Sequence, residues 1–162
     1  MYITYGIQNK GKLIYEEIPY TNEILENMVK RNHFGFAIMN ISKYSNDAEN
    51  GSSANFSLIN QFLKDSELSK RNFIREEISL LEPDIIITVN LWEGHISNTE
   101  LEKIFPTSDC SNLKTIEGIA NLWDFNLNGK KIQLLDLFHF SCRGSDKTKF
   151  YDPSMKLLFN KI

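Results

Sequence analysis

Residues 73–89 read FIREEISLLEPDIIITV, and this stretch decides the fold that we expect. Its first half spaces Ile74, Ile78 and Leu81 along one side of a helix, and Pro83 ends that helix. Its second half, IIITV, is a continuous run of β-branched residues, which is typical of a strand buried on both faces of a parallel sheet. An amphipathic helix that leads directly into such a strand indicates a βαβ unit.

The segments around this unit predict further strands and helices. Residues 2–18 predict a hairpin, and Asn128-Gly129 is a strong turn signal. We expect a single α/β domain over residues 1–162, built as a three-layer sandwich with a central, mostly parallel sheet. That sheet is expected to hold residues 36–40, 85–89 and 133–138. Helices are expected to begin near Asn22, Phe56, Ser69, Ser97 and Asp152.

Composition narrows the classes of protein. The chain is 41% hydrophobic and 12% aromatic, which is enough to fill one sizeable core. It has no apolar run near the roughly 20 residues of a membrane span and no visible signal peptide, so we expect a cytoplasmic protein without membrane contact. Cys110 and Cys142 lack CxxC spacing, and the three histidines are scattered, so we expect no disulfide framework, metal or cofactor. The formal charge of -3 restricts any DNA contact to a local patch.

The end of the last predicted strand carries the first candidate functional group. The apolar run stops at His139-Phe140-Ser141, and a small basic loop follows. In open α/β sheets ligands bind beyond the carboxyl ends of the strands, so a histidine there faces a crevice. Arg143, Lys147 and Lys149, opposed only by Asp146, form a local basic cluster that could contact a nucleic-acid backbone. The alternatives are a hydrogen-bonded structural histidine and a solvated loop.

Three blocks in this order resemble the uracil-DNA glycosylase superfamily: FAIMNISK at residues 36–43, REEISLLEPDIIITVNLWEGH at 75–95 and LLDLFHFSCRGSDKTKFY at 134–151. The resemblance implies that Asn40 hydrogen-bonds a base flipped out of DNA. It also implies that His139-Phe140-Ser141 stands for the family's His-Pro-Ser motif. Ser141 and Arg143 then lie against the substrate, and Lys147 and Lys149 contact DNA.

The chemistry of base excision suits these residue types. Cleavage of an N-glycosidic bond produces a sugar cation and a base anion, so a donor from His139 aimed at a base oxygen stabilises charge in the transition state. The side chain of Asn40 has both a donor and an acceptor, so it could pair with N3 and O4 of uracil and discriminate against cytosine. An aromatic ring such as Phe34, Phe36 or Tyr44 could stack on the base.

Several departures separate the chain from that family. The family's water-activating loop, a Gly-rich segment with an acidic or polar catalytic residue, has no counterpart in residues 1–33. Phe140 replaces the family's proline, and the cysteines of its iron-sulfur branch are absent. Asp47 and Glu49 are the nearest carboxylates after Asn40 that could supply the missing acid.

We therefore expect a divergent uracil-DNA glycosylase-like protein that recognises a nucleobase in DNA, and we leave open whether it hydrolyses the N-glycosidic bond. The alternative is a non-catalytic module of the same fold that binds nucleic acid or a protein partner. A third interpretation is an unrelated flavodoxin-like or Rossmann-like domain with a small-molecule pocket. Under the glycosylase interpretation, Asn40 and His139 converge on one cleft at the same end of the sheet.

Overall fold

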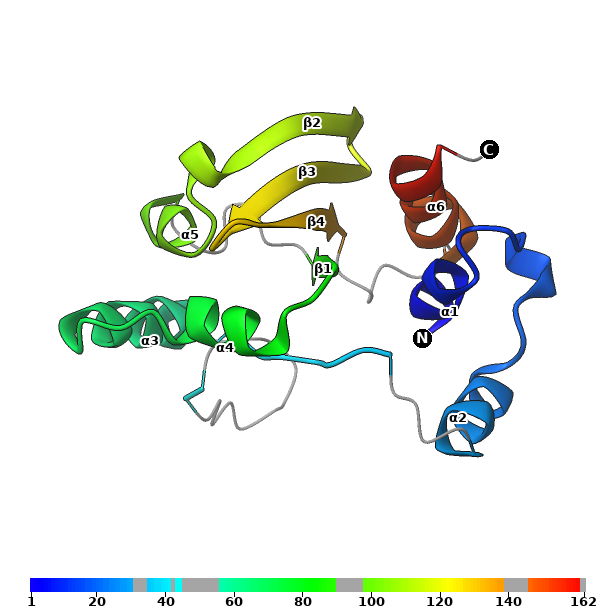
Figure 1. Cartoon of the computed structure of the whole chain (residues 1–162), viewed down its shortest axis with the longest axis horizontal. Helices are drawn as coiled ribbons and strands as arrows, with labels where there is room; N and C mark the ends of the chain where they lie inside the picture. Colours follow the sequence, from blue (N-terminus) through cyan, green and yellow to red (C-terminus); the bar gives the residue numbers. More distant parts are fainter. Residues whose placement is uncertain (31–34, 42, 45–55, 90–97, 139–145, 161–162) are drawn as a thin grey trace.

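The computed structural model describes residues 1–30, 35–41, 43–44, 56–89, 98–138 and 146–160. Its centre is a four-stranded sheet in the order β1-β4-β3-β2 (Figure 1). β1 (Ile85–Val89) runs parallel to β4 (Lys130–Leu137), whereas β3 (Ala120–Leu127) is antiparallel to both β4 and β2 (Cys110–Ile116). The protein is α/β as expected, but the prediction of a mostly parallel sheet is wrong, because the β1–β4 pair is the one parallel pair in the described part of the chain.

Short turns explain why three of the four strands are antiparallel. Asn128 and Gly129 join β3 to β4 with backbone φ angles of 54° and 83°. Two consecutive residues with positive φ form the tight hairpin turn that matches the twist of antiparallel strands. Gly118, with φ 64°, lies in the turn between β2 and β3. The sequence predicts the Asn-Gly turn but not β2, because the residues of β2 are mostly polar and exposed.

The strand expected at residues 36–40 is absent. Residues 35–41 have no regular secondary structure, and the side chain of Ile38 is 87% exposed. Met39 and Ile41 nevertheless pack against the core. An apolar run of this length does not specify a strand by itself, because it needs a partner strand to satisfy its backbone groups.

Residues 2–18 form a helix and a turn rather than the expected hairpin. Helix α1 (Tyr2–Gln8) is followed by a 3-10 turn, η1 (Tyr15–Glu17). Gly6 brings α1 close to the C-terminal part of the chain, since a Cβ at this position would lie 2.5 Å from Cε2 of Tyr151. The Tyr151 hydroxyl donates a hydrogen bond of 2.8 Å to the carbonyl oxygen of Leu13. Tertiary packing therefore overrides the strand-like sequence.

Four other helices begin within one residue of their predicted starts, whereas α4 begins at Phe73 rather than near Ser69. α4 (Phe73–Leu81) begins after Asn72, whose Oδ1 accepts a 3.0 Å hydrogen bond from the backbone N–H of Arg75, and it ends at Glu82 in a left-handed conformation. A π-helical turn, η3 (Asp146–Tyr151), leads directly into the last helix. The remaining helices are α2 (Thr21–Lys30), α3 (Phe56–Leu68), α5 (Asn98–Ile104) and α6 (Asp152–Phe159).

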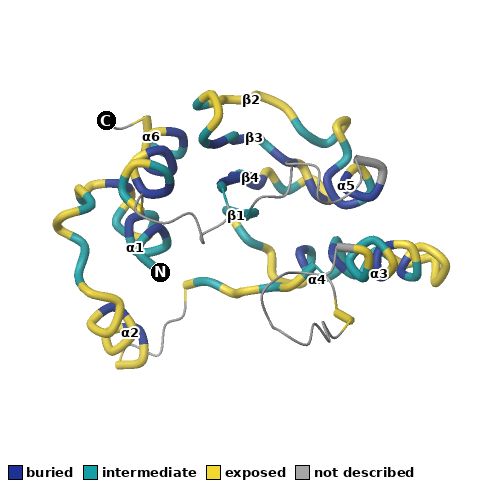
Figure 2. The backbone as a smooth tube through the Cα atoms, turned by 180° about the vertical axis from the view of Figure 1, so that it is seen from behind, coloured by how far each residue is buried: buried dark blue, intermediate teal, exposed yellow. Residues whose placement is uncertain are grey.

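Helices lie on both faces of the sheet. One face, called here the first face, packs against α3, α4 and α5 through side chains such as Leu134 of β4. The opposite second face packs against α1, η3 and α6 through side chains such as Leu135. Figure 1 shows the two groups of helices toward opposite ends of the sheet. In Figure 2, many residues of β3 and β4 are buried, whereas most residues of β2 are exposed.

The two helical layers cover different ends of the sheet. On the first face the apolar side chains lie near the β3–β4 hairpin, where Phe125 pairs with Ile132. On the second face they lie at the other end, where Ala120 pairs with Leu137. Polar side chains occupy the carboxyl end of β4 on the first face, which is the end where a ligand site is expected.

Candidate functional site

Most of the predicted site residues lie outside the described part of the chain. His139, Ser141 and Arg143 fall in the segment 139–145, and the candidate acids Asp47 and Glu49 fall in 45–55. Their roles stay predictions. Asn40 is described, and it is an exposed residue in the irregular segment rather than the last residue of a strand. The predicted convergence of Asn40 with His139 is therefore also outside the part of the chain that the structure describes.

The described strands define one edge of the sheet from which two predicted segments start. Val89 and Leu137 are register partners at the ends of the parallel strands β1 and β4. The chain continues from Val89 into residues 90–97 and from Phe138 into residues 139–145. Because parallel strands end at the same edge, Val89 and Leu137 mark the carboxyl edge of the sheet, which is where ligands bind in open α/β sheets.

A line of four polar side chains crosses the first face one residue before this edge. Asp136 of β4 pairs in register with Thr88 of β1 and with Asn121 of β3, and Asn121 pairs with Thr115 of β2. We call Thr88, Asp136, Asn121 and Thr115 the polar row. It takes one residue from each strand. The next row toward the hairpin on the same face is apolar and contains Leu134.

Asp136 is the chemically distinctive member of the polar row. Its exposed fraction is 6%, and its Oδ1 accepts a 2.6 Å hydrogen bond from the hydroxyl of Thr88. Aspartate is almost never fully buried unless it is paired, because burial removes the hydration of the carboxylate. A buried carboxylate at a strand end is therefore a candidate functional group with a physical basis.

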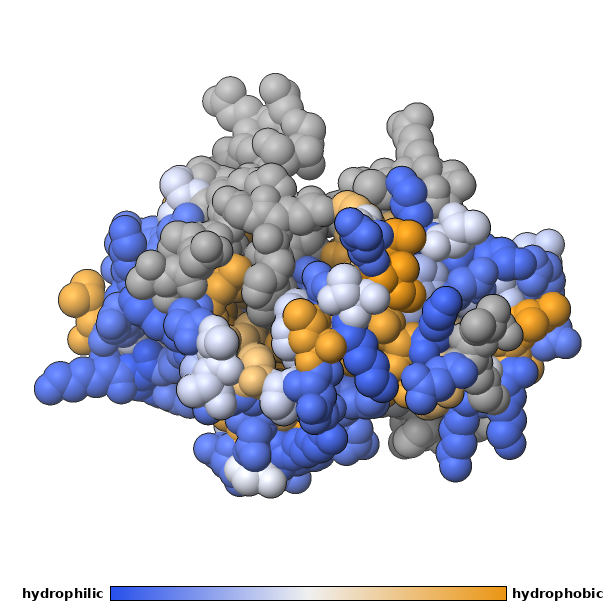
Figure 3. Space-filling view, turned by 90° about the horizontal axis from the view of Figure 1, so that it is seen from above, coloured by the Kyte–Doolittle hydropathy of each residue, from blue (hydrophilic) through white to orange (hydrophobic). Residues whose placement is uncertain are grey.

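The other side of the row is a second hydrogen-bonded pair. The Thr115 hydroxyl donates to Oδ1 of Asn121 at 3.0 Å. Exposure increases along the row from buried Asp136 through half-buried Asn121 to exposed Thr115. The row thus leads from the interior of the sheet to solvent at the β2 edge. Figure 3 views the molecule from the β2 side, where the described surface is mostly hydrophilic.

The predicted DNA-binding lysines lie on the π-helical turn η3. Lys147 forms a hydrogen-bonded ion pair with Glu16, and both side chains are about half exposed to solvent. The hydrogen bond lowers the pKa of Glu16 and raises the pKa of Lys147. Lys149 is half-buried on the same turn. Because ion pairs at the surface are weak, Lys147 could leave Glu16 and bind a DNA phosphate instead. This contact with DNA stays a prediction.

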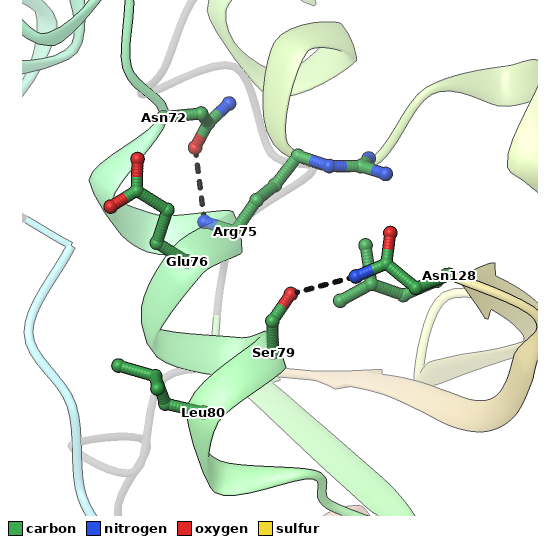
Figure 4. Close-up of a pocket in the computed structure, with 7 residues that line it drawn as sticks. Asn72, Arg75, Glu76, Ser79, Leu80 and Asn128 are labelled. Atoms are coloured by element: carbon green, nitrogen blue, oxygen red, sulfur yellow. Dashed lines mark hydrogen bonds between the residues drawn. The ribbon is translucent and has the colours of Figure 1, made fainter.

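A shallow cavity of about 420 Å³ lies between α4 and the β3–β4 hairpin (Figure 4). Its polar side chains already hold one another. Asn72 caps the backbone of Arg75, the Arg75 guanidinium binds the carbonyl oxygen of Ile104 at 3.0 Å, and Nδ2 of Asn128 donates to Ser79 at 3.2 Å. This arrangement fixes α4 against the hairpin, so the structural role is the simpler account of the cavity.

The described residues contain neither a membrane-spanning helix nor a group of side chains suited to a metal ion. No helix there is both long and apolar enough to cross a bilayer. The same residues bring together no group of three histidine, cysteine, aspartate or glutamate side chains that could hold a metal ion.

Asp136 is not among the site residues predicted from the sequence, because it lies inside the run LLDLF, which is typical of a buried strand. The signal that could have found it is a single charge in an otherwise apolar strand, since such a residue needs a partner or a function. No protein-family model, curated protein or solved structure matches this chain, so the resemblance to uracil-DNA glycosylases remains a prediction.

Proposed function

We propose that the protein binds a nucleobase at the polar row, with uracil in DNA as the first candidate. The observation that carries the proposal is the buried carboxylate of Asp136, hydrogen-bonded to Thr88 beside the carboxyl ends of the parallel strands. This position agrees with the general location of ligands in open α/β sheets. Asp136 lies one residue before the carboxyl end of β4, and His139 follows three residues after Asp136 in the sequence.

The burial of Asp136 differs in kind from the burial of its apolar neighbour. Its neighbour on the same face, Leu134, is fully buried and contributes to the hydrophobic core. A carboxylate at a comparable depth contributes no apolar burial and loses hydration, so it costs free energy unless hydrogen bonds compensate. Retaining the charge is reasonable if the carboxylate interacts with a ligand.

The chemistry of the row fits the edge of a base. An ionised carboxylate has two oxygens with about four lone-pair sites, so it can accept hydrogen bonds from several donors at the same time. Trp123 lies two residues from Asn121 on the same face of β3 and packs partly against the core. An indole next to a hydrogen-bonding row provides an apolar border for a planar ring, and bases removed from a stack are held in this way.

The carboxylate also bears on the choice between enzyme and binding module. The resemblance to the glycosylases leaves the chain without a recognisable water-activating loop, and Asp136 is a candidate acid for that role beside Asp47 and Glu49. Positioned acid or base groups contribute typically about 10²- to 10⁴-fold to a rate. A non-catalytic module would use the same row for binding and show no base release.

The test measures binding and turnover on the same DNA. Fluorescence anisotropy compares an oligonucleotide that carries one uracil with an otherwise identical one that carries an abasic site. We expect the full chain to prefer the uracil oligonucleotide, and Asp136→Asn to reduce that preference about 10-fold or more, because hydrogen bonds to charged groups are worth about 1.5–3 kcal/mol. Strand cleavage after alkali treatment reports base release.

Asp124 provides a matched control. It is another aspartate of the sheet, but it lies on the second face, where Lys131 contacts its Oδ2 at 2.8 Å. Asp124→Asn should leave the preference for uracil unchanged. Equal binding of both oligonucleotides by the unmodified protein would overturn the proposal. Base release that falls by about 10²-fold or more in Asp136→Asn identifies an enzyme, and binding without release identifies a module.

DNA contact through the basic turn is tested separately. Lys147→Ala should weaken binding to both oligonucleotides alike. It should also reduce the slope of log affinity against log salt concentration by about one, because one phosphate contact is lost. Glu16→Gln should have the opposite effect on affinity, because it releases Lys147 from its ion pair. An unchanged salt dependence in both variants would move the DNA contact away from this turn.

A further inference from the structure

The C-terminal end of α4 carries two leucines that face solvent. Leu80 is 85% exposed, and the next residue, Leu81, is also exposed. Single exposed apolar residues are common on protein surfaces and mean little by themselves. Leu68, the last residue of α3, is 81% exposed and is an example. Leu80 has an additional feature, because it lies on the rim of the 420 Å³ cavity between α4 and the β3–β4 hairpin.

The cavity beside Leu80 has a fixed shape. The hydrogen bond from Asn128 to Ser79 joins its two sides (Figure 4), and buried Leu127 lines it from the hairpin. Leu80 does not fill the cavity, because its side chain lies on the side of α4 away from Asn128 in Figure 4. The surface therefore presents an apolar projection directly beside a cavity with apolar side chains in its lining. We call the cavity and the exposed side chains of Leu80 and Leu81 the α4 patch.

A projection beside a cavity is the shape that fits a second copy of the same surface. In a contact with two-fold symmetry both copies use the same patch, so each contact occurs twice. A second copy, rotated by 180°, can place its Leu80 over the cavity of the first copy and receive the first copy's Leu80 over its own. Both leucines are then removed from water, which is favourable. Because projection and cavity belong to one patch, the contact closes at two copies and does not propagate.

The charges around Leu80 also suit an identical partner. Two identical surfaces repel each other when they bring like charges together. Arg71 forms an ion pair with Glu76, which lies one helical turn before Leu80. On the C-terminal side of α4, Lys130 contacts the carboxylate of Asp84 at 3.1 Å. Each copy thus brings cations and anions in pairs, and neither of these pairs adds net charge of one sign to the contact.

We propose that α4 and the β3–β4 hairpin form the contact surface of a homodimer, in which Leu80 of each copy packs into the cavity of the other. The α4 patch lies at the hairpin end of β4, whereas the carboxyl edge lies at the opposite end, so the dimer leaves that edge uncovered in both copies. The patch is smaller than the roughly 800 Å² per partner of stable complexes. We therefore expect a reversible dimer with a dissociation constant between about 1 μM and 1 mM.

The experiment is sedimentation equilibrium of the full chain at a series of concentrations. We expect a monomer–dimer equilibrium. Leu80→Glu should raise the dissociation constant by about 10-fold or more, because it places a charge in an apolar contact twice per dimer. Ser79→Gln tests the cavity independently, since a longer neutral side chain occupies part of it and should also weaken the dimer. Leu68→Glu is the control, because it makes the same change at a similarly exposed leucine, and it should leave the dissociation constant unchanged.

The outcomes separate this contact from general stickiness. Circular dichroism checks that each variant is folded, and both leucines are exposed, so the charged replacements should preserve the fold. An unmodified chain that is still monomeric at about 1 mM would overturn the proposal. Equal weakening by Leu80→Glu and Leu68→Glu would overturn it as well, because the α4 patch would then have no special role. Growth beyond two copies would contradict the closed two-fold contact.

Discussion

Leu134 and Asp136 lie two residues apart on the same face of β4, and their exposed fractions are 0% and 6%. The two sites are thus similarly buried but opposite in chemistry. Leu134 belongs to the apolar end of the first face, where α3, α4 and α5 cover the sheet. Asp136 belongs to the polar row at the carboxyl end. The difference shows that burial serves stability at one end of the strand and holds a charged group in place at the other.

The apolar end should give the largest effect on stability. Leu134→Ala removes a fully buried side chain from the centre of the first face. We expect the free energy of unfolding to fall by about 2–5 kcal/mol, because both apolar burial and packing are lost. Denaturant titration followed by circular dichroism measures this change. Leu113→Ala on exposed β2 is the control and should change stability by less than about 0.5 kcal/mol. A loss below 1 kcal/mol for Leu134→Ala would break the contrast between the two ends.

The carboxyl end of the sheet should depend on the second face for its stability. Gly6→Ala places a methyl group 2.5 Å from Cε2 of Tyr151 and 3.0 Å from the sulfur of Met155. Separation of α1 from η3 and α6 should cost about 1–3 kcal/mol of unfolding free energy. The same denaturant titration measures it. Gly118→Ala is a control for steric crowding, since nothing lies within 4 Å of a Cβ at that turn, although its positive φ carries its own smaller cost.

Asp136→Leu tests directly whether the polar row serves function rather than stability. We expect the free energy of unfolding to rise by about 1 kcal/mol, because a leucine of similar size avoids the cost of desolvating a buried carboxylate. The Thr88 hydroxyl retains an acceptor in the Leu135 carbonyl oxygen, 3.5 Å away. Thermal unfolding reports stability and oligonucleotide binding reports function. A loss of more than about 2 kcal/mol would show that Asp136 holds the fold together, and the contrast with Leu134 would disappear.

The smallest effect concerns pH and the tyrosines beneath the carboxyl end. Burial, followed by the negative charges of Asp146 and Tyr15, raises the pKa of Tyr2 to about 12. A raised pKa favours the neutral phenol in the folded state, so this contribution to stability is complete below the ordinary tyrosine range and is lost as pH rises through about 12. Tyr2→Phe should make unfolding less sensitive to pH in that window. Tyr20→Phe, at a residue that is 80% exposed, should not. An identical alkaline profile for both variants would count against this assignment.

The elements that the sequence predicts well are those whose signal is local. β1 and the end of α4 follow from a β-branched run and from Pro83, and the β3–β4 turn follows from Asn128-Gly129. The arrangement of the strands could not be predicted in the same way. β2 is polar and exposed, so nothing in its sequence marks it as a partner of β3, and missing it turned an antiparallel meander into an expected parallel sheet.

The candidate site was predictable in location more than in identity. The strand-end argument directs attention to the end of the last strand, and the polar row lies there. Its members come from four strands, and their alignment depends on a register that one sequence does not reveal. Asn40 illustrates the opposite case, because its expected role required a strand that the described segment does not form.

The offset of the two helical layers also determines how the sheet should open. Leu134 and Leu135 are consecutive residues, both fully buried, and they face different layers. The centre of β4 is therefore the part of the sheet that both described helical layers contact. Amide hydrogens at the centre should exchange with solvent only through global unfolding, and those at the carboxyl end should exchange through smaller local openings. Such a gradient allows the polar row to open and admit a ligand while the centre of the sheet stays folded.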